Sequence, residues 1–351
     1  MKSSKGSIVC LSVLLVAVFI FSSTITFAAT VEAELQKLHA AAKAEGEVIW
    51  QYPGAVQEIT AVIDIFRARY PDIKLSVVSI GATSVASRIA VEAAAGKLSM
   101  DVATSFSGYL LPVLDRDLLL KSDWVKIVDV DPKRITFDGR FVTFADVSHI
   151  WVYNTKSVSK AEAPKTLEDT LHPKWKGQKI SIRGAPSGFT WLFPVWKQDK
   201  QKAIDYLKRL ATQEIMPATR GAEGMNRIAT GECPIGVSGI SIVIPTMRKG
   251  APLALCPIPA AADQEGLFIL KGVRHPNAAR FLLAWLASSE GTKAFRAAGL
   301  GPSYPPDASP QAKILADNGI AFTSIQSAED IREYTGPFSE TVMKIMGLKP
   351  E

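Results

Sequence analysis

The sequence has only three cysteines among its 351 residues, and it shows no block of like charges, no internal repeat and no low-complexity segment. Three cysteines exclude a small protein held together by a disulfide framework. Lys and Arg outnumber Asp and Glu by 40 to 34. This mild excess is spread along the chain and does not indicate nucleic-acid binding. Hydrophobic residues make up 47% and charged residues 21%, which is globular composition, and the length suggests two lobes.

Catalytic and cofactor motifs are also scarce. The four histidines are scattered and form no metal-binding pattern, and neither a Walker loop nor a G-x-G-x-x-G motif occurs. Gly236–Gly239 resembles a nucleophile elbow, but the second glycine of that motif is replaced by Ile240. We therefore expect no enzyme activity, no cofactor and no resident metal. An exported hydrolase using Ser238 or Ser187 as nucleophile is the weaker alternative.

The first 28 residues have the pattern of a secretory signal peptide. Lys2 and Lys5 precede an apolar run from Ile8 to Phe21, and small residues follow up to Ala28. We expect cleavage near Ala28 and a periplasmic protein, with a retained membrane anchor as the alternative.

The mature chain would then keep two cysteines, Cys233 and Cys256. They could form a disulfide if the strands beside them run antiparallel, or remain two buried thiols.

Alternating apolar segments predict an α/β protein. Val31–Glu45 is expected to form a helix that Gly46 ends. The long apolar run Phe141–Tyr153 suits a strand that crosses between lobes. The other strands are expected at residues 48–50, 73–80, 101–105, 179–183, 235–237, 253–258 and 267–270. The other helices are expected at residues 59–70, 81–96, 110–120, 190–198, 203–210, 242–249, 277–287 and 292–298. Such alternation favours parallel sheets covered on both faces.

Four turns rich in glycine, serine and threonine follow predicted strands and open, or nearly open, predicted helices. They are Gly81–Ser84, Ser105–Gly108, Ser187–Thr190 and Ser238–Ser241. Helix N-termini expose unpaired N–H groups and attract anions, although each turn alone is more often only a helix cap. Two turns precede the crossing strand and two follow it, so we expect an anion site in a cleft between lobes.

The candidate ligand-binding residues follow from these turns, from nearby arginines and from the loop after the first strand. They are Tyr52, Gly54, Thr83, Ser84, Ser105, Arg183, Ser187, Gly188, Thr190, Arg220, Ser238 and Ser241.

Several segments resemble the extracellular solute-binding proteins of ABC importers, in the branch that includes iron(III), phosphonate and thiamine binders. The resemblance lies in Leu38–Trp50, Pro164–Ile182, Ala229–Ile235 and His275–Gly291. It implies a type II periplasmic-binding fold with two α/β lobes, two hinge crossings and a ligand in the cleft. By this resemblance, lobe one would comprise 29–146 and 262–306, lobe two 150–258, and the tail 307–351 would pack on lobe two.

The same resemblance leaves the ligand open. Iron-binding members carry a tyrosine pair after the strand that corresponds to 235–237, but here that stretch is Val237–Ser241 and contains no tyrosine. Hydroxyls and backbone amides suit an organic anion such as a carboxylate, phosphonate or phosphate ester better than they suit ferric iron. We expect a monomer that binds this small molecule, closes around it and docks on an inner-membrane ABC permease, with ferric-iron binding as the alternative.

Overall fold

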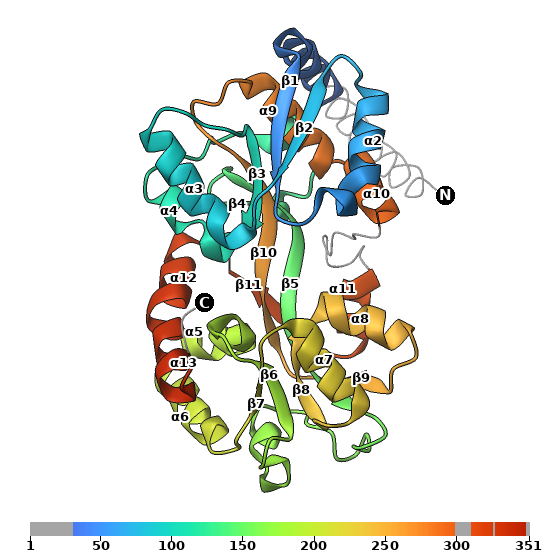
Figure 1. Cartoon of the computed structure of the whole chain (residues 1–351), viewed down its shortest axis with the longest axis vertical. Coiled ribbons are helices and arrows are strands. Elements are labelled where there is room, and N and C mark those ends of the chain that lie inside the picture. Colours follow the sequence, from blue (N-terminus) through green and yellow to red (C-terminus); the bar gives the residue numbers. More distant parts are fainter. Residues whose placement is uncertain (1–30, 299–309, 326, 349–351) are drawn as a thin grey trace, which may run out of the picture.

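The computed structural model describes residues 31–298, 310–325 and 327–348, so the predicted signal peptide lies outside the described residues. The chain forms two α/β lobes that lie end to end along the long axis of the molecule (Figure 1). Two long strands, β5 (Phe141–Asn154) and β10 (Ala260–Ile269), run through the junction between the lobes. No helix in the described ranges is long and apolar enough to cross a membrane.

The first lobe is built on a parallel three-strand unit with the order β2-β1-β3. The predicted helix at residues 31–45 is present, and the β/α alternation that follows it is confirmed. Its strands and helices are β1 (Glu47–Tyr52), α2 (Thr60–Arg69), β2 (Lys74–Ser79), α3 (Ala82–Ala94), β3 (Val102–Phe106), α9 (Pro276–Ala287) and α10 (Ser289–Ala297). A short β4 (Ile135–Thr136) pairs with β5.

The second lobe repeats this organisation around the order β8-β6-β7, again with parallel pairing. Its strands and helices are β6 (Ile180–Arg183), α5 (Phe193–Gln198), α6 (Lys200–Ala211), β7 (Met216–Ala218), α7 (Gly221–Thr230), β8 (Ile235–Gly239), α8 (Ile240–Arg248) and β9 (Leu253–Leu255). The sequence patterns did not predict β7 and α7. The stretch before α5 forms a 3-10 helix, Pro186–Leu192, where a regular helix from residue 190 was expected.

The crossing strands join the two sheets. The first part of β5 pairs with β10 and its last part, His149–Tyr153, pairs with β8. The crossing predicted for residues 141–153 is therefore confirmed. The strand predicted at 267–270 is in fact the end of a much longer strand, which pairs with both β3 and β5. A hydrophobicity pattern did not detect the whole strand, because three consecutive polar residues, Asp263 to Glu265, interrupt its apolar sequence.

The helix predicted at 110–120 is wrong in length. The structure has only one turn, α4 (Leu111–Leu114), because Asp117 adopts a left-handed conformation with φ of 49° and ends the helical path. Leu119 then makes an isolated bridge to Leu270.

Cys233 and Cys256 are buried free thiols. Strands β8 and β9 both pair antiparallel with β5, along the same stretch of it. The two strands therefore run parallel to each other, on opposite edges of β5. Cys233 precedes the start of β8, whereas Cys256 follows the end of β9, so the two thiols do not meet as they would across an antiparallel pair of strands.

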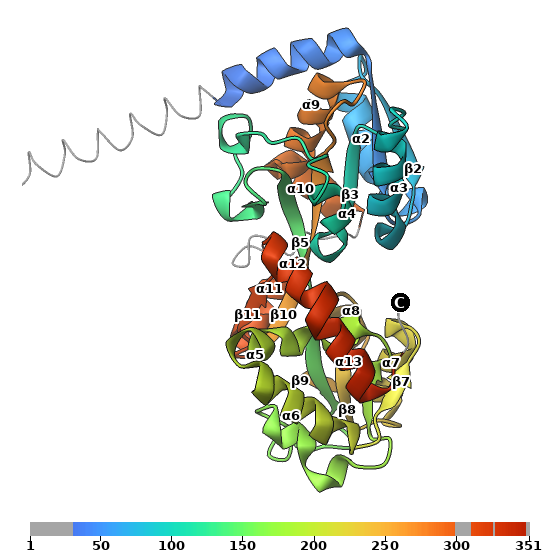
Figure 2. The same ribbon diagram turned by 90° about the vertical axis from the view of Figure 1, so that its left-hand side faces the viewer.

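The C-terminal segment contacts both lobes rather than the second one alone (Figure 2). It contains α11 (Pro310–Asp317), β11 (Phe322–Ser324), α12 (Ala328–Glu333), a π-helical turn at Tyr334–Phe338 and α13 (Ser339–Met346). Helix α12 contacts α4, and Arg332 forms an ion pair with Asp115 of the first lobe. Helix α13 packs on α6 of the second lobe.

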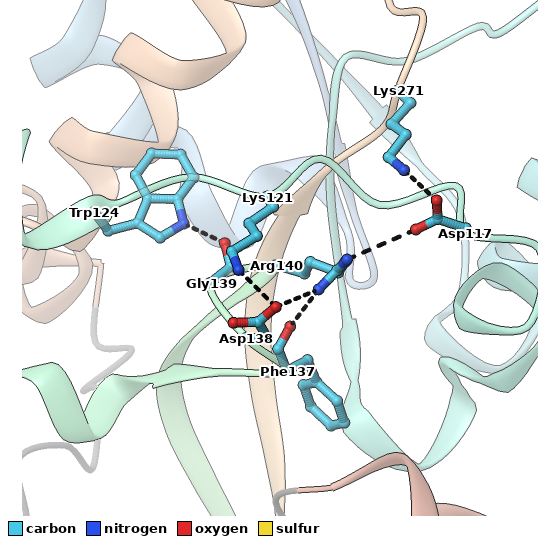
Figure 3. Close-up of polar contacts among 8 residues, drawn as sticks. All are labelled: Asp117, Lys121, Trp124, Phe137, Asp138, Gly139, Arg140 and Lys271. Carbon is cyan, nitrogen blue, oxygen red and sulfur yellow. Dashed lines mark hydrogen bonds and ion pairs between the residues drawn. The ribbon is translucent and has the colours of Figure 1, made fainter.

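A polar cluster fixes the turn between β4 and β5 in the first lobe (Figure 3). Asp138 accepts from Lys121 at 2.7 Å and from Arg140 at 3.1 Å. Asp117 forms ion pairs with both Arg140 and Lys271, and Trp124 donates to the Gly139 carbonyl at 3.0 Å. The ion pairs are exposed and contribute little each, so we assign the indole hydrogen bond the larger part in holding this turn.

Candidate functional site

A cavity of about 440 Å³ lies at the junction of the lobes. The first lobe contributes the end of β3 and the 3-10 turn Ser107–Tyr109, and β10 contributes Asp263. The second lobe contributes the ends of β6 and β8 and the starts of α7 and α8. The C-terminal segment closes one wall with Tyr334, Thr335, Ser339 and Met343.

Half of the predicted ligand-binding residues line this cavity, and all of them come from the second lobe. They are Arg183, Ser187, Thr190, Arg220, Ser238 and Ser241. Their elements are parallel strands with the same polarity, so the turns at their carboxyl ends meet at one edge of the sheet, as expected for α/β folds.

The β8–α8 turn presents the strongest anion-binding features. Gly239 is the extended cap residue of α8, so the first backbone N–H groups of a nine-residue helix begin at the cavity wall. The Ser238 side chain is 3% exposed, and its Oγ has no hydrogen-bond partner within the described residues. A buried hydroxyl without a partner costs free energy unless a ligand or water satisfies it.

Arginine side chains give this wall positive charge. Arg183 ends β6 and Arg220 precedes α7, and both line the cavity. The Arg220 side chain is exposed, and its guanidinium makes no ion pair within the described part of the chain. Arginine suits carboxylates and phosphates because its planar group donates two parallel hydrogen bonds.

Thr190 lines the cavity, but its hydroxyl is already in use. Its Oγ1 donates to the Ser187 carbonyl at 2.9 Å and lies 2.7 Å from the Tyr334 hydroxyl. Gly188, in contrast, does not line the cavity. A side chain at Gly188 would meet the Arg183 carbonyl at 2.4 Å, so this glycine permits the turn to pack against β6.

Of the residues predicted in the first lobe, four do not line this cavity: Tyr52, Gly54, Ser84 and Ser105. Tyr52 is buried beside Trp50, and Gly54 lies against Glu58. Thr83 and Ser84 lie in the first turn of α3, where the Ser84 hydroxyl donates to the Gly81 carbonyl at 3.0 Å. The buried Ser105 hydroxyl donates to the Ala82 carbonyl at 3.0 Å. As ligand-binding residues, these five and Gly188 remain predictions.

The first lobe instead faces the cavity through Phe106, Gly108 and Tyr109, close to Asp263 of β10. The Asp263 Oδ1 accepts from Ser107 Oγ at 2.6 Å and from the Gly108 backbone N–H at 3.1 Å. The sequence pattern indicated the Ser105–Gly108 turn, but neither Asp263 nor the C-terminal residues of the cavity were predicted. No local pattern marked these, because only the fold brings them beside residues more than a hundred positions away.

Burial shifts the titration of the groups around the cavity. It raises the pKa of Asp263 to about 6, against the opposing effect of the hydrogen bonds from Ser107 and Gly108. It also raises the pKa of Glu265 to about 7, with the charge of Asp263 adding to the effect. Burial lowers the pKa of His149 to about 4, and the positive charge of Arg183 lowers it further. His149 is therefore neutral at neutral pH, and its buried Nδ1 has no hydrogen-bond partner within the described residues.

The described ranges show neither the usual arrangement of a metal site nor that of a nucleophilic serine with its base. No group of three or more histidine, cysteine, aspartate or glutamate side chains is placed there to hold a metal ion. Ser238 and His149 both line the cavity, but neither the serine Oγ nor the His149 Nδ1 has a hydrogen-bond partner within these ranges. A nucleophilic serine needs its base within hydrogen-bond reach.

Comparison with known proteins places the fold in a known group. Residues 61–322 match the family described as bacterial extracellular solute-binding proteins. An uncharacterized protein of Haemophilus influenzae is 30% identical over 149 residues, which are 39% of this chain and 42% of that protein. The Fe(3+)-binding periplasmic protein of Serratia marcescens is 32% identical over 85 residues, 24% of each chain. The matched segments thus span less than half the length of these relatives.

The fold as a whole is similar to solved structures. Iron-bound HitA from Pseudomonas aeruginosa superposes with a TM-score of 0.66 at 18% identity, covering 85% of this chain and 99% of that one. At this identity the similarity shows the two-lobed fold.

Proposed function

The chain belongs to the family of bacterial extracellular solute-binding proteins, and we propose that it captures a small organic anion in the interlobe cavity for an ABC importer. The anion would be a carboxylate, phosphonate or phosphate ester. Ligand binding across the two lobes would favour the closed form, which would dock on a membrane permease. Export to the periplasm follows from the family's extracellular role.

One observation carries the proposal for an anion. Two arginines, the buried and unpartnered Ser238 hydroxyl and the N-terminus of α8 line the same cavity. Each feature alone has a structural explanation, but together they place hydrogen-bond donors and positive charge around one cavity. Charge-assisted hydrogen bonds from such a site would favour an anionic group.

A thermal-shift screen of the purified protein tests this function. The panel holds dicarboxylates, aromatic carboxylates, phosphonates, sugar phosphates, thiamine, polyamines and ferric citrate. We expect one anion class to raise the Tm, since a ligand at a thousandfold excess over its Kd stabilises the native state by about 4 kcal/mol.

Arginine variants link that stabilisation to the cavity. Arg220→Ala should weaken the anion about tenfold or more, because a charged hydrogen-bond donor is lost, and Arg183→Ala should do the same. Arg209→Ala is the matched control, since Arg209 lies on α6 and pairs with Glu168 away from the cavity. Unchanged affinity in both cavity variants would contradict an anion site here.

Ferric iron is the second candidate ligand. The tyrosine pair of iron-binding members is absent at Val237–Ser241, but the structure brings Tyr109 and Tyr334 to the cavity from other elements. If tyrosinate binds iron here, ferric citrate should produce a visible charge-transfer band that Tyr109→Phe or Tyr334→Phe removes. If iron alone raises the Tm and produces this band, the ligand is ferric iron rather than an organic anion.

A further inference from the structure

Asp263 places negative charge on the wall of the cavity that Arg183 and Arg220 also line. Its Oδ1 is held by Ser107 and Gly108 of the first lobe. No ion pair with a lysine, arginine or histidine balances this carboxylate within the described ranges, and the groups that interact with it there are hydrogen-bond donors rather than cations. A buried carboxylate without a cationic partner is costly, and a ligand cation would offset that cost.

The strand order separates the two charges across the cavity. Strands β10, β5, β8 and β6 are successive neighbours, so Asp263 on β10 and Arg183 on β6 stand on either side of β5 and β8. Both side chains line the same cavity of about 440 Å³, which leaves room for a ligand of several atoms.

Apolar side chains also line the cavity, from Phe106, Val237, Ile242 and Met343. On β5 and β8, the strands between Asp263 and Arg183, the lining includes His149 and the buried, unpartnered Ser238 hydroxyl. A ligand that fits this pattern has an anionic end, an apolar middle and a cationic end.

We propose that the captured solute is zwitterionic, with its anionic group at Arg183, Arg220 and Ser238 and an ammonium group donating to Asp263. This inference rests on the proposed anion-binding function and adds the cationic end of the ligand. By this inference, Asp263 determines the selectivity of the site for amino carboxylates over simple carboxylates.

Matched ligand pairs test the inference by isothermal titration calorimetry on the purified protein. The probes are β-alanine, γ-aminobutyrate and ε-aminocaproate, each paired with the carboxylate that lacks its amino group. We expect at least one amino carboxylate to bind about tenfold or more tightly than its partner, because a charge-assisted hydrogen bond to a buried group is gained.

Asp263→Asn should remove this preference while leaving the simple carboxylate's affinity unchanged or higher. The asparagine oxygen can still accept from Ser107 and Gly108, so the fold should be kept, and the Tm without ligand checks this. Glu265→Gln is the matched control: it makes the same change two residues along β10, at a side chain that does not line the cavity. It should keep the preference.

The outcomes separate this inference from the proposed function. Equal affinities within every pair overturn the inference and leave the anion site standing. A preference that survives Asp263→Asn also overturns it. If no anion of the screen or of these pairs binds at all, the proposed function itself fails.

Discussion

At the scale of single residues, the junction between the lobes brings groups of opposite charge close together. Arg183 and Arg220 line the cavity, and Asp263 and Glu265 lie on β10. Charged residues in a cleft are candidates for function, because packing alone would favour apolar side chains there.

Glu265 does not line the cavity. The free-energy cost of burying its carboxylate can therefore be measured separately from ligand binding.

Glu265→Gln should stabilise the protein at alkaline pH. Burial raises the folded-state pKa of Glu265 to about 7, above the unfolded value of about 4.3. The folded state therefore binds the proton more tightly, and this group's contribution to stability falls as the pH rises through that window. Near pH 8 we expect the free energy of unfolding of the variant to be about 1–3 kcal/mol higher than that of the wild type. Each unit of pKa shift corresponds to about 1.4 kcal/mol, and the partial exposure of the side chain reduces the effect.

Urea unfolding at several pH values measures this gain. It should shrink toward zero as the pH falls to about 4.5, because wild-type Glu265 is then protonated in the native state. A gain that does not depend on pH would show that packing, rather than the buried charge, is responsible.

At the scale of elements, the turns that connect strands have specific backbone requirements. The turn between β4 and β5 has left-handed residues at Phe137, Asp138 and Gly139, with φ of 51°, 58° and 80°. At Gly139 the backbone also passes close to Ser122: an added Cβ would lie 2.6 Å from the Ser122 carbonyl oxygen. This turn starts the crossing strand β5, so its geometry sets where the crossing begins.

Gly139→Ala should therefore destabilise the protein more than a substitution at an equally left-handed but open glycine. Gly272 has φ of 78° and no atom within 4 Å of an added Cβ, so Gly272→Ala isolates the backbone cost of about 1–2 kcal/mol. We expect the Gly139 variant to lose about 1–3 kcal/mol more, because the Ser122 contact must also be relieved. Denaturant unfolding of the two variants checks this, and equal losses would show that the close contact is relaxed without cost.

At the scale of the whole molecule, β5, β10 and the C-terminal segment connect the lobes. Helix α12 contacts the first lobe and α13 the second, and the turn between them lines the cavity through Tyr334. A ligand held in the cavity would contact strands, helix starts and this segment together. Ligand binding can therefore stabilise the arrangement of the lobes in which all of these contacts are made.

Saturation with the bound anion should reduce the radius of gyration measured by small-angle X-ray scattering. A compact chain of this size has a radius of gyration of roughly 20 Å, and lobe closure should lower the measured value by about 1 Å. Arg220→Ala at the same ligand concentration should stay at the ligand-free value. An unchanged radius at saturation would contradict hinge closure as the response to the ligand.

Local sequence patterns were sufficient to predict most of the strands and helices in their order, although not β7 and α7. The β/α alternation, the long crossing strand at residues 141–153 and the Ser187–Thr190 and Ser238–Ser241 turns depend on spacing within a few residues, which hydrophobic periodicity and helix capping report directly. The family resemblance agrees with the matched family and the two-lobed fold.

Which turns share the cavity depends on contacts between segments that are far apart in the sequence. Asp263 joins Ser107 across 156 positions of sequence, and Tyr334 joins Thr190 across 144. Both meetings depend on strand order, register and the return of the C-terminal segment, which no local pattern encodes. The Gly81–Ser84 turn satisfies the same local rule as Ser238–Ser241, yet neither Gly81 nor Ser84 lines the cavity, and the Ser84 hydroxyl donates to the Gly81 carbonyl.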